Sequence, residues 1–354
     1  MAEDLEIPHL NLLKDPLIRT DYEDDGHERR SLAGVLHDLA RDRKIQGFRA
    51  LQPHQWHAWY VFMVQLAAMA SLERGGEAPR TEEGWQQALR HLSGAPADDS
   101  PWCLVVPEFD RPAFLQPPVP EGTLKDFKGP FDQPDSRDLD LLVTATDHDL
   151  KVERQTKAEA DHWLFSLVAY QTLSGYSGKY NYGVIRMNGG TATRPVVGLA
   201  RARGWSDMFQ RDLAVLIDHH APLARQKGLM GPGHRLLWLL PWDGTTSVPW
   251  ADCSPYCIEI ARRVRLQASN SGLRAWLRAT EKPRLSPKSD TLKGNVGDPW
   301  IPVKSEGQAA NVGSAGWHYN LVRQILLGDG YHWAPAQAPR PDDPDPLWFY
   351  AAAL

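Results

Sequence analysis

The segment PHQWHAWYVFMVQLAAMASLER, residues 53–74, decides the fold, because it contains the longest predominantly apolar run of the chain. Pro53 suits the first turn of a helix, and Gly75-Gly76 suits its end. Apolar residues occupy all sides of this helix, which predicts a central helix that is buried on every face. The run from residue 60 to residue 72 is 13 residues long, whereas a bilayer requires about 20.

Further elements are predicted on both sides of this helix. Ser31 and Ser206 can cap helices through about residues 44 and 218. Hydrophobic periodicity predicts further helices over 81–92, 158–173 and 317–327, and strands over 102–106, 139–143, 194–199, 236–240 and 257–266. Residues 109–137 carry six prolines and no periodic pattern, which predicts a long loop. The expected fold class is α+β: a helix-rich large domain with irregular mixed sheets and long loops.

Length and composition favour a folded protein. The chain has 354 residues, of which 42% are hydrophobic and 23% charged, so a sizeable core is expected, in two packed domains or one elaborate domain. Three cysteines cannot form a disulfide framework, and the acidic start of the chain does not resemble a signal peptide. We therefore expect a cytoplasmic protein. Fourteen tryptophans is a high number, so some should lie at surfaces that meet a partner.

The net charge of −5 conceals an asymmetry along the chain. Residues 1–150 hold 15 basic and 27 acidic side chains, whereas residues 151–304 hold 22 basic and 12 acidic ones. The acidic tail, residues 305–354, follows. A basic segment of this kind permits a local phosphate-binding face. The alternative is that the acidic and basic parts attract each other within the fold.

Motifs for catalysis or metal binding are weak. The sequence has no His-Glu-x-x-His, Walker, Gly-x-Ser-x-Gly or Gly-x-Gly-x-x-Gly motif. Asp147-His148-Asp149 places two carboxylates beside a histidine, but neighbours in sequence need not converge in space. Cys253 and Cys257 form one close pair, for which His219-His220 could supply the missing zinc ligands. A packing role is favoured for His54 and His57 at the start of the apolar helix.

The glycine- and tyrosine-rich segment GYSGKYNYG, residues 175–183, is the most informative candidate site. Glycines allow close backbone approach to a ligand, tyrosines offer flat faces to bases, and Lys179 supplies a positive charge for phosphate. A second basic cluster, Arg262-Arg263-x-Arg265, could be either a ligand contact or a solvated sheet face. The candidate DNA-binding residues are Gly175, Tyr176, Ser177, Gly178, Lys179, Tyr180, Asn181, Arg186, Asn188, Arg262 and Arg263. For the loop, the alternative is a hairpin whose tyrosines pack on the fold.

Several short motifs, in order along the chain, resemble the CasA family, the large subunit of the type I-E CRISPR Cascade complex. They are LNLLKDPLI (10–18), RPAFLQ (111–116), the glycine loop, RMNGG (186–190), ARRVRL (261–266), KGNVGDPWIPV (293–303) and the stretch from residue 316 onward. Each is weak alone, but their shared order carries the resemblance over nearly the whole chain. All of residues 1–354 would then form a CasA-like N-terminal region.

The resemblance implies a non-catalytic subunit without a cofactor or metal, acting in antiviral defence. Such a subunit senses the protospacer-adjacent motif in duplex DNA through the glycine loop and promotes unwinding, while base pairing with crRNA reads the target. Its partners are other Cascade subunits, the crRNA 5′ handle, target double-stranded DNA and a recruited helicase-nuclease; no membrane is involved. Residues 144–154 correspond to the region that contacts the handle.

Two departures from the family are expected to matter. The chain ends at Leu354, about where the family's glutamine wedge and C-terminal four-helix bundle would begin, so the bundle is expected to be absent. The family's lysine finger has no counterpart in residues 243–256, which lack lysine, and Arg262 or Arg263 could replace it. The alternatives are a structural Cascade subunit that holds the crRNA handle without sensing the motif, and a zinc-dependent nuclease.

Overall fold

A computed structural model describes residues 9–41, 43–95, 97–129, 136–139, 159–188, 193–229, 232–270, 272–286, 292–313 and 316–353. The Asp147-His148-Asp149 cluster, the expected handle-contacting region 144–154 and Gly189-Gly190 lie outside the described residues. Most of the strand predicted over 139–143 does as well.

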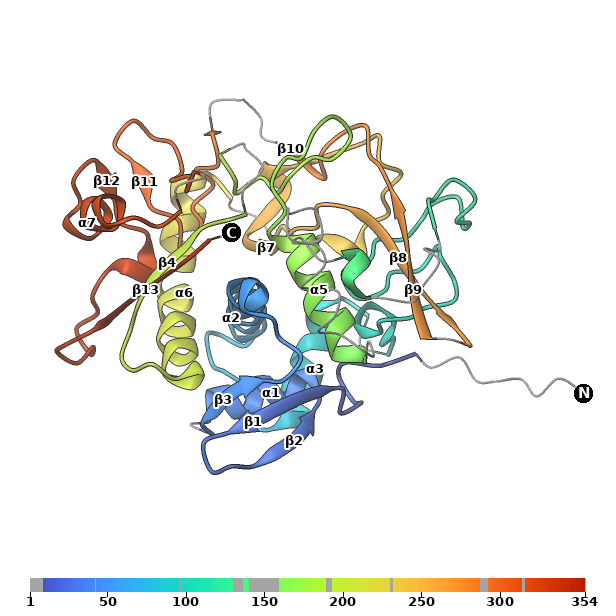
Figure 1. The fold of residues 1–354 in the computed structure, drawn as a ribbon, viewed down its shortest axis with the longest axis horizontal. Coiled ribbons are helices and arrows are strands. Elements are labelled where there is room, and N and C mark those ends of the chain that lie inside the picture. Colours follow the sequence, from blue (N-terminus) through green and yellow to red (C-terminus); the bar gives the residue numbers. More distant parts are fainter. Residues whose placement is uncertain are drawn as a thin grey trace, which may run out of the picture.

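The long apolar helix is the centre of the fold, as predicted. Helix α2 (Trp56–Leu72) buries nearly all of its residues and lies between α5 (Ala160–Thr172) and α6 (Trp205–Lys227) (Figure 1). The other helices in the described part of the chain are α1 (Leu32–Ala40), α3 (Glu82–Leu92) and α7 (Tyr319–Leu327). No helix among the described residues is both long and apolar enough to span a membrane.

Side-chain caps mark the starts of α1 and α3, where the sequence placed them. Ser31 and Thr81 each accept a hydrogen bond from the backbone N–H three residues later, at the starts of α1 and α3. Helix α6 begins at Trp205, one residue before the predicted cap Ser206, whose hydroxyl donates instead to the Arg43 carbonyl at 3.1 Å. It also continues past the predicted end at residue 218 and through Pro222, keeping Leu223 buried on the core side.

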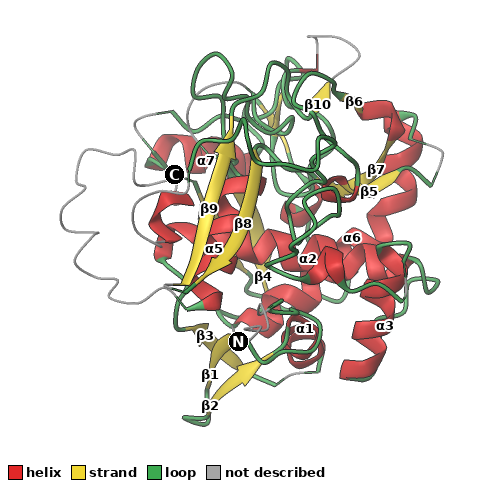
Figure 2. Cartoon of the chain, turned by 90° about the vertical axis from the view of Figure 1, so that its right-hand side faces the viewer, coloured by secondary structure: helices red, strands yellow, loops and turns green. Residues whose placement is uncertain are grey.

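The strands form small separate sheets (Figure 2). Antiparallel β1, β2 and β3 form the only three-stranded sheet of the described residues, and β8–β9 is the longest two-stranded ladder. Strand β13 pairs with β4 and so brings the end of the chain beside its middle. The strands are β1 (Ile18–Tyr22), β2 (His27–Arg30), β3 (Ile45–Phe48), β4 (Val196–Ala200), β5 (His234–Leu236), β6 (Val248–Pro249), β7 (Cys253–Ile258), β8 (Arg263–Ser269), β9 (Gly272–Arg278), β10 (Leu285–Ser286), β11 (Val303–Lys304), β12 (Tyr331–His332) and β13 (Trp348–Ala352).

Three strand predictions need correction. Trp102 ends the short 3₁₀ helix Ser100–Trp102, Cys103 forms only an isolated β-bridge with Asn11, and residues 104–106 lie outside any strand. Residues 237–239 form a 3₁₀ turn after β5. The strand predicted over 257–266 is two strands, β7 and β8, separated by residues 259–262. The backbone N–H groups of Ala261 and Arg262 donate to Gln171 at 2.9 Å each, and so they leave the sheet ladder.

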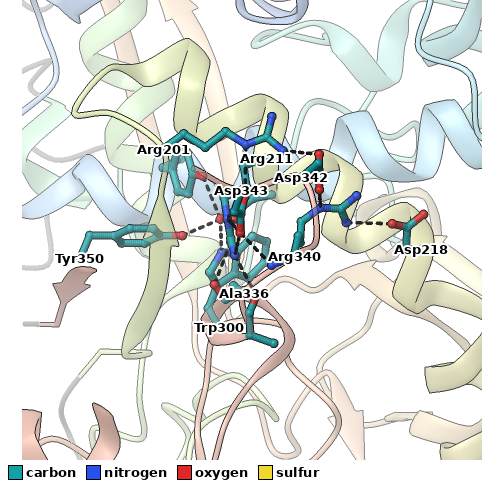
Figure 3. Close-up of polar contacts among 12 residues, drawn as sticks. Arg201, Arg211, Asp218, Trp300, Ala336, Arg340, Asp342, Asp343 and Tyr350 are labelled. Atoms are coloured by element: carbon teal, nitrogen blue, oxygen red, sulfur yellow. Dashed lines mark hydrogen bonds and ion pairs between the residues drawn. The ribbon is translucent and has the colours of Figure 1, made fainter. Parts of the chain in front are cut away.

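A polar cluster attaches the C-terminal segment to α6 (Figure 3). The buried Asp343 carboxylate accepts hydrogen bonds from Arg211 at 3.0 Å and from Arg201 at 3.1 Å. Beside it, the fully buried Asp212 carboxylate accepts from Tyr60, Trp300 and Tyr350. Burial raises the pKa of Asp212, although these hydrogen bonds oppose the shift. The cluster therefore joins α2, α6, residue 300 and β13 in one network.

Candidate nucleic-acid interface

The glycine- and tyrosine-rich loop is closed at its base by main-chain contacts. It follows α5, and the Val184 N–H donates to the Ser174 carbonyl at 2.9 Å. The two ends of the loop run so close together that a Cβ on Gly183 would lie 2.5 Å from the carbonyl carbon of Gly175. Only glycine fits at residue 183, and the loop therefore leaves the fold as a narrow neck.

The tip of the loop is a tight turn. The Ser177 N–H donates to the Asn181 carbonyl, and the Asn181 N–H donates to the Gly178 carbonyl, both at 3.0 Å. Gly178 has φ of 115°, a conformation that L-residues avoid, while the space around its missing Cβ is open. The Thr280 N–H donates to the Tyr180 carbonyl at 3.1 Å, which fastens the tip to the chain after β9.

The tip presents the groups that a nucleic-acid contact needs. Ser177, Lys179 and Asn181 are exposed, and Tyr176 and Tyr180 each keep 43% of their surface exposed. The Lys179 ammonium lies 4.8 Å from the centre of the Tyr180 ring. The tip of the loop is therefore a solvent-facing arrangement of aromatic faces, backbone groups and one positive charge, while the third tyrosine, Tyr182, is half-buried.

Arg262 supports the loop from beneath. Its guanidinium is buried and donates to the carbonyls of Tyr182 and, at 3.3 Å, Gly175, which lie at the two ends of the loop. Burial lowers the pKa of Arg262. Its planar fork of donors binds both ends of the loop at once, so this side chain positions the loop.

Arg186 and Asn188 also face the protein interior. Arg186 donates to Glu259 at 2.7 Å and lies 3.5 Å from the Asp298 carboxylate. Burial alone would lower the pKa of Arg186, but the neighbouring Cys257 together with these two carboxylates outweighs it and raises that pKa. The Asn188 amide donates to the Ala309 carbonyl at 3.2 Å. Both side chains hold in place the turn that follows the loop.

The remaining arginines correct one expectation. Arg263 is 1% exposed and donates to the Asp243 carbonyl at 2.7 Å, and Arg265 is fully buried and donates to the Arg111 and Val106 carbonyls. Burial lowers the pKa of Arg263 and brings that of Arg265 to about 10. The alternative of a solvated sheet face is therefore wrong. Arg262 and Arg263 are both buried and hydrogen-bonded to backbone carbonyls of the fold.

The candidate zinc ligands do not assemble. Cys253 and Cys257 are buried on β7, and no three His, Cys, Asp or Glu side chains of the described residues are placed to hold a metal ion. His219 and His220 lie on α6, where burial lowers the pKa of each. His57 packs inside the core, and burial lowers its pKa to about 4.

Glu259 and Asp298 are the supporting residues that sequence reasoning missed. Glu259 accepts from Arg186 and also from the Ile185 N–H at 2.8 Å. Asp298 pairs with the buried Arg194 and lies within the KGNVGDPWIPV motif, which it brings next to the loop. A charged residue between two isoleucines, as in Ile258-Glu259-Ile260, was the available signal for Glu259, because a buried carboxylate requires a partner.

The sequence matches no established family profile and no curated protein. Several solved structures match in fold, among them the following three. The first is CasA (Cse1) of Thermus thermophilus, with TM-score 0.57 and 14% identity over 93% of this chain and 66% of that chain. The second is CRISPR-associated protein Cse1 of Acidimicrobium ferrooxidans, with TM-score 0.56 and 13% identity over 93% and 63%. The third is a chain of a CRISPR RNA-guided surveillance complex in a pre-nicking state, with TM-score 0.52 and 14% identity over 97% and 70%.

These matches confirm the expected α+β fold and its resemblance to the CasA structures. The chain spans about two thirds of the length of the two Cse1 structures that it matches.

Proposed function

Because the chain has the fold of the CasA (Cse1) structures, we propose that it is the large, non-catalytic subunit of a type I-E-like crRNA-guided surveillance complex. In this role it senses the short motif beside the target in duplex DNA and promotes unwinding in antiviral defence. The observation that carries the proposal is the exposed loop of residues 176–181, which stands on buried Arg262 within this fold.

The chemistry of the loop suits a duplex groove. Glycine and serine at its tip let backbone groups approach base edges, and Lys179 can neutralise a phosphate. Guide RNA reads the target by base pairing, so the protein needs to read only the short adjacent motif. A small loop on a rigid base is sufficient for that task.

An exposed apolar surface supports assembly with other subunits. We define the α7 patch as Tyr319, Leu326, Leu327 and Trp333, which are between 39% and 79% exposed. Helix α7 and β12 lie together at the outer edge of the molecule (Figure 1), and the Trp333 indole donates to the Ile325 carbonyl at 2.8 Å. Exposed apolar patches of this kind are typical of protein interfaces. The proposed partners are other Cascade subunits with the crRNA and, during interference, a recruited helicase-nuclease.

Photocrosslinking tests the proposed DNA contact. A photoreactive residue replaces exposed Ser177 in the reconstituted complex, and a control replaces exposed Asp24 in the turn between β1 and β2. We expect crosslinks from residue 177, and not from residue 24, to duplex DNA next to the motif. A chain that crosslinks only to the crRNA handle would instead be a structural subunit, and an uncrosslinked residue 177 would contradict the proposed contact.

A further inference from the structure

A small cavity opens directly behind the loop. Its volume is about 260 Å³, and its walls come from three segments, residues 176–187, 283–285 and 292–294. Buried Val184, Met187 and Leu285 form its floor, while Tyr176 and Tyr182 stand at its exposed side. The two tyrosine rings are 6.1 Å apart and inclined by 50°. The cavity is therefore an apolar recess with aromatic faces at its opening.

The size of the cavity limits its occupant. An apolar cavity of about 150 Å³ accommodates benzene, and pockets for drug-sized ligands occupy about 300–1,000 Å³. A volume of about 260 Å³ therefore suits one flat heterocycle that is somewhat larger than a single six-membered carbon ring. A purine or pyrimidine base is such a group.

We propose that this cavity receives one unpaired base of the DNA strand that is displaced next to the motif. The inference rests on the proposed function, because opening the duplex at the loop releases bases that have lost their stacking partners. Enzymes that extrude a base hold it between aromatic and apolar side chains, and the walls of this cavity are of the same kind.

The rim of the cavity carries a positive charge and is packed tightly against the segment that follows the loop. Exposed Lys293 lies on the rim with φ of 41°, where its charge can meet the phosphate of an extruded nucleotide. At the adjacent Gly294, with φ of 78°, a Cβ would meet the Asn188 nitrogen at 2.9 Å. Among the described residues, five non-glycine residues have positive φ; one of them, Lys293, lines this cavity, and another, Tyr180, lies at the tip of the loop. Such strained residues cluster at functional sites.

A double-mutant cycle that combines a change in the DNA with a change in the protein tests whether the cavity holds a base. Target duplexes carry a single abasic site at successive positions of the displaced strand beside the motif, and their affinity for the reconstituted complex is measured. We expect one position at which loss of the base weakens binding about tenfold, the scale of one lost base–aromatic stack. Leu292→Trp and Ile185→Trp each fill the cavity from a different wall. Either variant should bind the intact duplex about tenfold more weakly than wild type does. Removing the base at the sensitive position should then not weaken binding any further.

The control is Ala221→Trp, which adds the same ring at an exposed position of α6 and should keep the abasic effect. Thermal unfolding verifies that each variant is folded, and having two filled variants keeps the test decisive if one misfolds. If binding depends on the motif but no abasic position loses its effect in the filled variants, this inference is overturned and the proposed function stays intact. Binding that ignores the motif in the wild-type complex would instead overturn the proposed function.

Discussion

Lys179 and Arg262 both contribute to the glycine- and tyrosine-rich loop, but Lys179 is exposed and Arg262 is buried. Lys179 is exposed, with the Tyr180 ring beside it, so its charge is open to a ligand. Arg262 is buried, and its donors are used on the carbonyls of Tyr182 and Gly175. One residue is therefore placed to bind and the other to position.

For Lys179→Ala we expect weaker binding of duplex DNA across all sequences, because a phosphate contact carries no sequence information. The slope of log affinity against log salt should decrease in magnitude by about 1, since one fewer counterion is released. Titrations of the complex at several salt concentrations measure this. Lys44→Ala, at an exposed lysine beside β3, should leave the slope unchanged, and equal slopes for both variants would refute a role for Lys179.

For Arg262→Lys we expect a loss of about 1–3 kcal/mol in the free energy of unfolding, because a single ammonium leaves buried carbonyls unsatisfied. The loop should also become more sensitive to limited proteolysis. Urea unfolding and digestion of the purified chain measure both effects. Arg225→Lys, at an exposed position near the end of α6, should change neither, so identical behaviour of the two variants would disprove the anchoring role.

At the scale of elements, the sequence predicted helices better than strands. Helices are local: the apolar run of α2 and the caps at Ser31 and Thr81 lie within the segment that folds. Strand partners are distant in sequence, so the break between β7 and β8, which depends on Gln171 of α5, had no local signal. The loop was recognised from its composition, but the burial of Arg186, Arg262 and Arg263 follows from packing that a single sequence does not display.

The attachment of the C-terminal segment to α6 predicts a pH dependence. Burial alone would raise the pKa of Asp343, but hydrogen bonds from Arg211, the Arg340 backbone and Arg201 outweigh it and lower that pKa. Because the pKa of this carboxyl is lower in the folded than in the unfolded state, its ionised form stabilises the protein. The stabilisation is fully present above the unfolded-state pKa of about 3.9 and is lost as the pH falls through the folded-state pKa.

Asp343→Asn should therefore lower the free energy of unfolding at neutral pH by about 1–3 kcal/mol, and the difference from wild type should shrink below about pH 4. Urea unfolding at a series of pH values measures it. Asp218→Asn removes a carboxylate that is 66% exposed and pairs with Arg340, and it should cost less than about 1 kcal/mol. A difference for Asp343→Asn that stays constant down to pH 2 would contradict the assignment.

On the scale of the whole molecule, part of the charge asymmetry along the chain is neutralised by ion pairs within the fold. Arg263 and Arg278 of the basic segment pair with Glu121 of the acidic one, and Arg235 pairs with Glu73. Several other arginines of the basic segment are buried. The internal attraction considered from the sequence is thus present, and the proposed DNA contact depends on the exposed loop rather than on net charge.

The α7 patch predicts a second effect that is independent of DNA. Leu327→Asp places a charge on a residue that is 68% exposed, so the isolated chain should keep its stability. Its incorporation into the reconstituted complex should fall, because a carboxylate would have to be desolvated at the interface. Size-exclusion chromatography measures incorporation, with Ala221→Asp at an exposed position of α6, outside the patch, as the control. Normal assembly of Leu327→Asp would exclude the patch as an interface.

The most direct test of the central claim is the affinity of the reconstituted complex for target duplexes with a randomised flanking motif. It is measured with the wild-type chain, with Gly178→Val and without the chain. Gly178 has φ of 115° and open space around its Cβ, so the variant disturbs the loop tip without a steric clash elsewhere. We predict that motif-dependent binding requires the chain and is largely lost in Gly178→Val. Motif selectivity that is unchanged without the chain, or unchanged by Gly178→Val, would contradict its assignment as the sensor.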